Sequence, residues 1–236
     1  MIEALIVSHG QPLGPEAGEK QLAAIADKVG ALLPNWDIRS ATLAAPDRLE
    51  ETLEGFSGVP YVFPMFMADG WFTKTALPER LAGRSVHQLS PLGVHPGLPH
   101  KTFKYLKSVA AARNWTFNSC EVMIAAHGSS TSSAAAECAL YFAKRIRCLT
   151  PFKKKIHTGF LAQRPFLHEV ARVSTPRTLL LPFLAGSGPH LTEDIPEELE
   201  KGRFLGVLLP AIGEADFVPG LIAHALKSAE LRSLAA

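Results

Sequence analysis

Short apolar runs alternate with amphipathic stretches along the whole sequence. Apolar runs of about four to eight residues are typical of buried strands, whereas apolar residues repeated every three or four positions are typical of helices. We expect strands at 4–7, 38–43, 59–66, 85–89, 122–126, 156–161, 178–183 and 204–208. We expect helices at 18–33, 46–53, 72–81, 98–113, 133–147, 166–173, 194–200 and 217–234. Because strands and helices alternate, we predict an α/β protein whose parallel sheets are covered by helices on both faces.

The second half of the sequence repeats the first at a shift of 118 positions. Residues 5–10 (LIVSHG) match residues 123–128 (MIAAHG), and residues 63–81 match residues 181–199 with two prolines, a glycine and a glutamate in register. Self-similarity at one fixed shift indicates an internal duplication. We therefore expect two similar halves, each with a four-stranded parallel sheet.

Composition is consistent with two domains, which we predict at residues 1–117 and 118–236. With 47% hydrophobic and 19% charged residues among 236, the chain can bury a full core in each half. No run of 18 apolar residues occurs, and no basic region precedes the first apolar run. We therefore expect neither a membrane span nor a signal peptide, and a cytoplasmic location. The three cysteines show no CxxC spacing, which argues against a disulfide framework or a thiolate zinc site.

The charge pattern argues against a nucleic-acid partner, since the net charge is only +2. Lys153 to Lys155 form the densest basic cluster, with Arg145 and Arg147 shortly before it. These cations suit a solvated loop after a helix end, or they attract a polyanionic ligand; the sequence leaves both interpretations open.

Two histidines follow strands of the second half. His127 comes directly after the expected strand 122–126, and His190 follows the strand 178–183 and a turn rich in glycine and serine. In a doubly wound sheet such loops open on one edge, where two imidazoles suit borderline divalent ions such as Co²⁺, Fe²⁺, Ni²⁺ or Zn²⁺. Two ligands fit a site that receives and passes on a metal better than a structural site, which takes four. The alternative is that each histidine simply hydrogen-bonds a loop carbonyl.

Asp194 fits a helix N-cap, because Pro196 lies in the first turn and Glu197 lies three residues further on. We therefore expect its role to be structural first.

Four segments resemble the class II tetrapyrrole chelatases, the sirohydrochlorin cobalt- and iron-chelatases. They are LPFLAGSGPHLTEDIPEEL (181–199), MIAAHGSS (123–130), GFLAQRP (159–165) and PLGVHPGL (91–98). The resemblance implies two similar chelatase-like α/β domains with a cleft between them that takes the tetrapyrrole. It implies that His127 and His190 bind the metal and are catalytic. It further implies Co²⁺ or Fe²⁺ as the substrate metal, no organic cofactor, and release of two protons.

The first half departs from the family pattern. His9 keeps its place, but Phe72 stands where His190 stands in the second half, with Trp71 beside it. Trp71 and Phe72 are therefore either an apolar wall for the macrocycle or core residues under the turn.

A glutamate that many family members carry near GFLAQRP has no counterpart in this chain. The aligned region offers Leu161, Ala162, Gln163 and Arg164 instead. We expect Arg164, Lys74 and the basic cluster around the carboxylates of the tetrapyrrole, and Glu193 and Asp194 to relay protons.

The resemblance therefore implies metal insertion into sirohydrochlorin or a related tetrapyrrole, in cobalamin or siroheme biosynthesis. One alternative is a non-catalytic homologue that carries tetrapyrrole or metal. Another is an unrelated α/β enzyme that binds phosphate, which is disfavoured because neither GxGxxG nor GxxxxGK[ST] occurs at a strand-to-helix turn. The sequence leaves the metal and the oligomeric state open.

Overall fold

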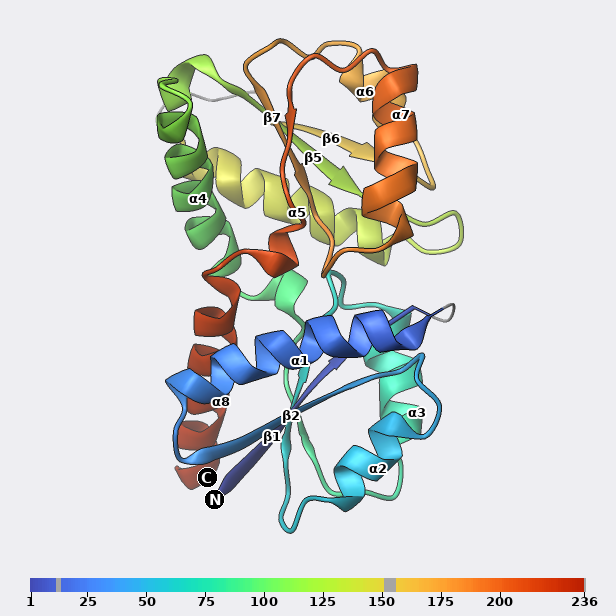
Figure 1. Cartoon of the computed structure of the whole chain (residues 1–236), viewed down its shortest axis with the longest axis vertical. Helices are drawn as coiled ribbons and strands as arrows, with labels where there is room; N and C mark the ends of the chain where they lie inside the picture. Colours follow the sequence, from blue (N-terminus) through green and yellow to red (C-terminus); the bar gives the residue numbers. More distant parts are fainter. Residues whose placement is uncertain (12–13, 151–155, 236) are drawn as a thin grey trace. The chain divides into compact units, whose positions relative to one another are not determined.

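Each half of the chain forms one four-stranded parallel sheet in the computed structural model, which describes residues 1–11, 14–150 and 156–235 (Figure 1). The first sheet has the order β2-β1-β3-β4 and the second the order β6-β5-β7-β8. The strands are β1 (Ile2–Ser8), β2 (Trp36–Thr42), β3 (Tyr61–Pro64), β4 (His87–Gln88), β5 (Glu121–Ala126), β6 (Ile156–Phe160), β7 (Thr178–Pro182) and β8 (Val207–Leu208). The predicted α/β class, with four parallel strands in each half, is confirmed.

Helices connect the strands throughout. They are α1 (Pro15–Leu32), α2 (Arg48–Glu54), α3 (Leu77–Leu81), α4 (Leu98–Ala112), α5 (Ala134–Leu149), α6 (Leu167–Ala171), α7 (Ile195–Lys201) and α8 (Val218–Leu234). Two π-helical turns, η1 (Phe72–Ala76) and η4 (His190–Asp194), lead directly into α3 and α7. The 3₁₀ turns are η2 (Leu92–Val94), η3 (Phe117–Ser119) and η5 (Ile212–Glu214). Among the described helices, none combines the length and the apolar character that crossing a bilayer requires.

The last strand of each sheet is shorter than the sequence predicts. In the second half the strand expected at 204–208 is reduced to β8, because the preceding N–H groups bond elsewhere. The N–H of Phe204 donates to the carbonyl of Leu199 at the end of α7, and the N–H of Leu205 donates to Ser174 Oγ. Phe204 therefore closes α7 and Leu205 binds the loop after α6, so neither extends the sheet.

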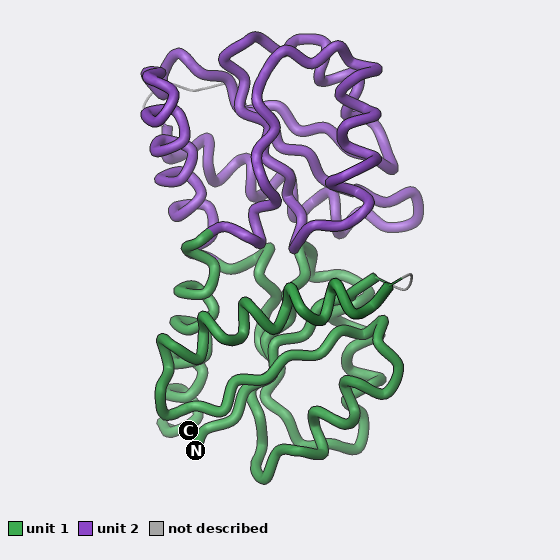
Figure 2. The backbone as a smooth tube through the Cα atoms, in the orientation of Figure 1, with its two compact units in different colours: residues 1–95, 216–236 green, residues 96–215 purple. Residues whose placement is uncertain are grey.

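The chain divides into two compact units, coloured separately in Figure 2. One unit comprises residues 1–95 and 216–236, and the other comprises residues 96–215. Helix α4 packs against α5 in the second unit, and α8 packs against α1 in the first. The predicted boundary between residues 117 and 118 marks the sequence repeat, and the compact units do not follow it, because the last helix of each half belongs to the other unit.

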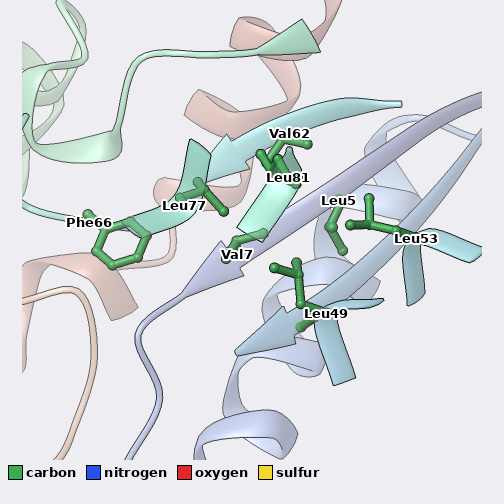
Figure 3. Packing of buried hydrophobic residues seen from close by; sticks show 9 residues of the cluster. Leu5, Val7, Leu49, Leu53, Val62, Phe66, Leu77 and Leu81 are labelled. Atoms are coloured by element: carbon green, nitrogen blue, oxygen red, sulfur yellow. The ribbon is translucent and has the colours of Figure 1, made fainter. Parts of the chain in front are cut away.

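The cores of the two units use equivalent residues. One cluster contains Leu5, Val7, Leu49, Leu53, Val62, Leu77 and Leu81 (Figure 3). The other contains Met123, Ala125, Leu167, Ala171, Leu180, Ile195 and Leu199. Each residue of the second cluster lies 118 positions after its counterpart in the first. The repeat seen in the sequence is therefore a repeat of the packing around each sheet.

A buried carboxylate at the start of the first sheet binds the loop before β3. Glu3 on β1 accepts hydrogen bonds from Ser57 N at 2.8 Å, Ser57 Oγ at 2.9 Å and Gly58 N at 2.8 Å. These bonds, led by that from the Ser57 backbone, lower the pKa of Glu3. In the second half Pro176 stands in the place of Gly58 and has no N–H to offer. Oε2 of Glu121, the counterpart of Glu3, accordingly has no hydrogen-bond partner among the described residues.

We expect Glu3→Ala to lower the free energy of unfolding at pH 7 by about 2 kcal/mol, because three donors lose a charged acceptor. Since the pKa of Glu3 is lowered in the folded state, this contribution is present above the unfolded-state value of about 4.3. It is lost as the pH falls through the lowered folded-state pKa, so the difference from wild type shrinks as the pH is lowered below the unfolded-state value. Urea unfolding at pH 7 and at a series of acidic pH values measures both effects. Glu121→Ala is the matched control, and an equal loss in the two variants would contradict the prediction.

Candidate metal site

His127 lies in the tight turn that follows β5. The carbonyl of His127 accepts a hydrogen bond from the N–H of Ala162 at 2.9 Å, which fixes its backbone beside the end of β6. Gly128 has a φ of 70°, a left-handed conformation that glycine adopts without strain. The imidazole is exposed, and its Nδ1 lies 2.9 Å from the carbonyl oxygen of Gly128. Because a carbonyl only accepts, Nδ1 of His127 carries the proton.

His190 opens the π-helical turn η4, which follows β7 and the turn 184–189. The N–H of Ile195 donates to the carbonyl of His190, so the turn is one residue wider than an α-helical turn. Asp194 Oδ2 lies 2.6 Å from His190 Nδ1. The carboxylate therefore orients the imidazole and holds its proton on Nδ1.

The expectation that Asp194 caps a helix is wrong. Its backbone is helical, with φ −62° and ψ −46°, and its side chain makes no capping hydrogen bond. The physical reason is that η4 and α7 form one continuous helix, so the N–H groups that a cap would satisfy do not occur at this position.

The two imidazoles lie against each other, with ring centroids 4.5 Å apart and planes at 60°. Both Nδ1 atoms donate to protein oxygens, so both Nε2 atoms of the neutral rings carry lone pairs. A metal about 2.1 Å from Nε2 lies about 3.2 Å from the ring centre, so this separation suits two ligands at about 90°. Carboxylate-to-histidine contacts of the kind made by Asp194 are typical of histidines that bind metals.

The part of the chain that the structure describes supplies no third ligand to the pair. Within residues 1–11, 14–150 and 156–235, no group of three or more His, Cys, Asp or Glu side chains could hold a metal. The remaining coordination positions of an ion on these two imidazoles are therefore open to water or to the nitrogens of a substrate.

The corresponding place in the first half has the same geometry without the second imidazole. His9 and Phe72 have ring centroids 4.5 Å apart, and Phe72 stacks on Phe66 at 5.6 Å and packs against the core. Burial lowers the pKa of His9. Ala76 stands where Asp194 stands in the second half. Two histidines are therefore brought together in the second half, and a histidine and a phenylalanine in the first.

Comparison with known proteins identifies the family. The CbiX family model matches residues 121–229. A solved structure, described as CbiX, the terminal enzyme for biosynthesis of siroheme in denitrifying bacteria, is 34% identical, with a TM-score of 0.87. The match covers 97% of this chain and 99% of that chain. The chain belongs to the CbiX family. The resemblance to the class II chelatases that the sequence motifs indicate is thereby confirmed.

Two more distant relatives are consistent with this assignment. A probable sirohydrochlorin cobaltochelatase of Halobacterium salinarum is 22% identical over 222 residues, which cover 82% of this chain and 75% of that protein. SirB of Bacillus subtilis, solved with Fe³⁺, is 17% identical and covers 100% of this chain and 98% of its own, with a TM-score of 0.77. At that identity the likeness supports the shared fold.

The remaining predicted residues of this CbiX family member lie in different surroundings. Trp71 is 61% exposed and meets Phe72 edge-on, with ring centroids 5.0 Å apart. Arg164 is exposed, pairs with Glu169 and lies over the ring of Phe166 at 5.4 Å. Lys74 pairs with Asp69 at 3.1 Å. Lys153 to Lys155 lie outside the described residues.

Two polar contacts behind the histidine turns were not predicted from the sequence. Gln163 Oε1 accepts the N–H of Ser129 at 2.9 Å, and Glu214 accepts both the N–H and the hydroxyl of Ser187. The signal for them is available only when the halves are aligned, because Ala45 stands in the place of Gln163 and Val94 in that of Glu214.

We expect Asp194→Ala to weaken Co²⁺ binding by about 10-fold, because an outer carboxylate fixes the tautomer and the orientation of a ligand histidine. Isothermal titration with Co²⁺ measures the effect. Glu197→Gln, one turn further along the same helix, is the control and is expected to bind as the wild type does. An unchanged affinity in Asp194→Ala would mean that the contact with His190 does not serve metal binding.

Proposed function

We propose that this protein inserts a divalent metal ion into sirohydrochlorin or a related tetrapyrrole, with Co²⁺ or Fe²⁺ as the substrate metal. Membership of the CbiX family and the described activities of its relatives support the reaction. The observation that carries the proposal is the pair His127 and His190, whose Nδ1 atoms both donate to protein oxygens. Both Nε2 lone pairs are thereby available to one ion.

His127 and His190 are both metal-binding and catalytic in this proposal. Each Nε2 holds the incoming ion until the nitrogens of the macrocycle replace it. As the ion leaves an imidazole, that Nε2 regains its lone pair and can accept one of the two protons that the ring nitrogens lose. The carboxylate of Asp194 accepts the proton of His190 Nδ1, so Nε2 is the nitrogen that can accept a proton. Two imidazoles can therefore account for two protons in a chain that lacks the family glutamate near residues 159–165.

The substrate contacts are assigned to Trp71, Phe72 and Arg164. Trp71 offers an exposed aromatic face to a flat macrocycle, and Phe72 supports it from the core side. Arg164 presents an exposed guanidinium that suits a carboxylate of the tetrapyrrole. The proposal needs no organic cofactor. The cytoplasmic location and the absence of nucleic-acid and membrane partners stay predictions.

A second candidate is a homologue that carries tetrapyrrole or metal without catalysis. The segment GFLAQRP favours it, because its carboxylate is missing and Gln163 is already bonded to the Ser129 backbone. The absorbance spectrum of sirohydrochlorin with added Co²⁺ or Fe²⁺ separates the two. An enzyme metallates many molecules of sirohydrochlorin per protein molecule, whereas a carrier changes the spectrum of at most one equivalent.

We expect His127→Ala and His190→Ala each to reduce Co²⁺ insertion by about 100-fold or more, because one imidazole cannot hold the ion and accept both protons. His9→Ala should keep activity within about two-fold of wild type, since Phe72 replaces the second ligand beside it. Initial rates from the absorbance assay measure all three variants. Equal losses of insertion rate in all three variants would contradict the assignment of catalysis to His127 and His190 alone.

We expect Trp71→Ala to raise KM for sirohydrochlorin about five-fold, because an aromatic contact to the macrocycle contributes about 1 kcal/mol. Co²⁺ affinity should stay at the wild-type value, since the metal ligands lie in the other unit. Leu205→Ala, which removes another exposed apolar side chain, is the control. An unchanged KM in Trp71→Ala would remove this residue from the substrate contacts.

A further inference from the structure

We propose that Glu214 and Gln163 are positioning residues for the histidine pair, each holding the turn that presents one imidazole. Glu214 holds the turn before His190, and Gln163 holds the turn after His127. This inference rests on the proposed role of His127 and His190 as metal ligands. It adds two residues that touch neither the ion nor the substrate and act through the backbone.

Glu214 binds the turn 184–189 at Ser187, three residues before His190. Its Oε1 accepts the N–H of Ser187 at 3.1 Å, and its Oε2 accepts the Ser187 hydroxyl at 2.9 Å. The neighbouring backbone also touches this turn, because the N–H of Gly213 donates to the carbonyl of Leu184 at 3.0 Å. A Cβ at Gly213 would lie 2.0 Å from the carbonyl oxygen of Ala185. The 3₁₀ turn η5 therefore lies in direct contact with the turn that leads into His190.

Gln163 holds the turn on the other side of the pair. Its Oε1 accepts the N–H of Ser129 at 2.9 Å, and a Cβ at Gly128 would lie 2.8 Å from its Cγ. Gly128 supplies the carbonyl that accepts the proton of His127 Nδ1. The carboxamide thus restrains the peptide that orients the His127 ring.

The first half shows that neither contact is needed to form these turns. There the N–H of Thr73 donates to the carbonyl of Gly70, as that of Leu191 donates to Gly188 in the second half. The N–H of Gly93 donates to Phe66, as that of Gly213 does to Leu184. At the other turn, Gly10 has a φ of 75° where Gly128 has 70°, and the N–H of Ala44 donates to His9 as that of Ala162 does to His127. The backbone therefore repeats at both turns although Val94 replaces Glu214 and Ala45 replaces Gln163.

The polar groups that differ between the halves change together. Where the second imidazole is replaced by Phe72, its carboxylate partner is Ala76 and the two turn contacts are Val94 and Ala45. The half that keeps the pair keeps all of these polar groups, whereas the core repeats in both halves. Their common feature is the restraint of two exposed imidazoles. A site with two protein ligands depends strongly on such restraint, because a loose ring loses alignment with the ion.

The experiment is a Co²⁺ titration of the full chain, with affinity and the visible Co²⁺ spectrum as readouts. We expect Glu214→Ala to bind about 10-fold more weakly, as is common when an outer partner of a ligand is removed. Glu214→Gln, which keeps an oxygen acceptor and the side-chain length, should stay within about three-fold of wild type. Ser187→Ala keeps the backbone donor and should fall between them. Gln163→Ala should weaken binding and change the spectrum in the same direction.

Asp69→Asn is the matched control, because Asp69 occupies the position of Ser187 in the first half and bonds Thr73. It should leave Co²⁺ affinity unchanged. The variants must also unfold at the wild-type urea midpoint, so that weaker binding does not reflect a smaller folded fraction.

The outcomes separate this inference from the proposed function. If His190→Ala binds Co²⁺ as wild type does, the proposed site is wrong and the positioning role is overturned with it. If His190→Ala weakens binding but Glu214→Ala and Gln163→Ala do not, only the positioning role is overturned. Equal losses in Glu214→Ala and Glu214→Gln would overturn positioning in favour of an effect of the negative charge.

Discussion

The parallel pairing of β5 with β7 is the constraint on which the site depends. The register runs from Glu121 opposite Thr178 to Ala125 opposite Pro182, and the N–H of Phe183 continues it by donating to Ala125. Both strands therefore end at one edge of the sheet, and the turns that leave them begin side by side. A slip of one residue would turn the core side chains of a strand to its other face. The buried clusters on these strands thus fix the place where His127 and His190 meet.

The duplication places two versions of this arrangement in one molecule. Seven core positions repeat at the same shift, and the π-helical turns η1 and η4 start at equivalent residues. Against this common frame, Phe72 fills the place of an imidazole and Trp71 is exposed beside it. The same backbone therefore supports a polar pair in one half and an aromatic cluster in the other. Burial of the core, and not the polar residues of the site, determines the fold.

Apart from the short strands β4 and β8, the sequence predicts the strands, the duplication and the closeness of His127 and His190, because each depends on periodicity or on register. The N-cap predicted at Asp194 is wrong, because proline and glutamate after an aspartate fit an N-cap, whereas η4 in fact continues into α7. The contact of Glu214 with Ser187 spans 27 residues, so no local pattern indicates it. The exchange of α4 and α8 is likewise invisible, because an amphipathic stripe does not specify which sheet it covers.

That exchange determines the order in which the chain can fold as it is synthesised. Domains generally fold from the N-terminus first. Here residues 96–215 form one uninterrupted unit, whereas residues 1–95 are completed only by residues 216–236. The unit with the imidazole pair contains all of its own strands and helices and can therefore close without α8. The first unit is complete only when α8 has been made. Until then, the face of α1 that α8 covers stays exposed. Nascent chains that stall late in translation should thus expose apolar surface on their N-terminal unit, which chaperones would bind and proteases would cleave.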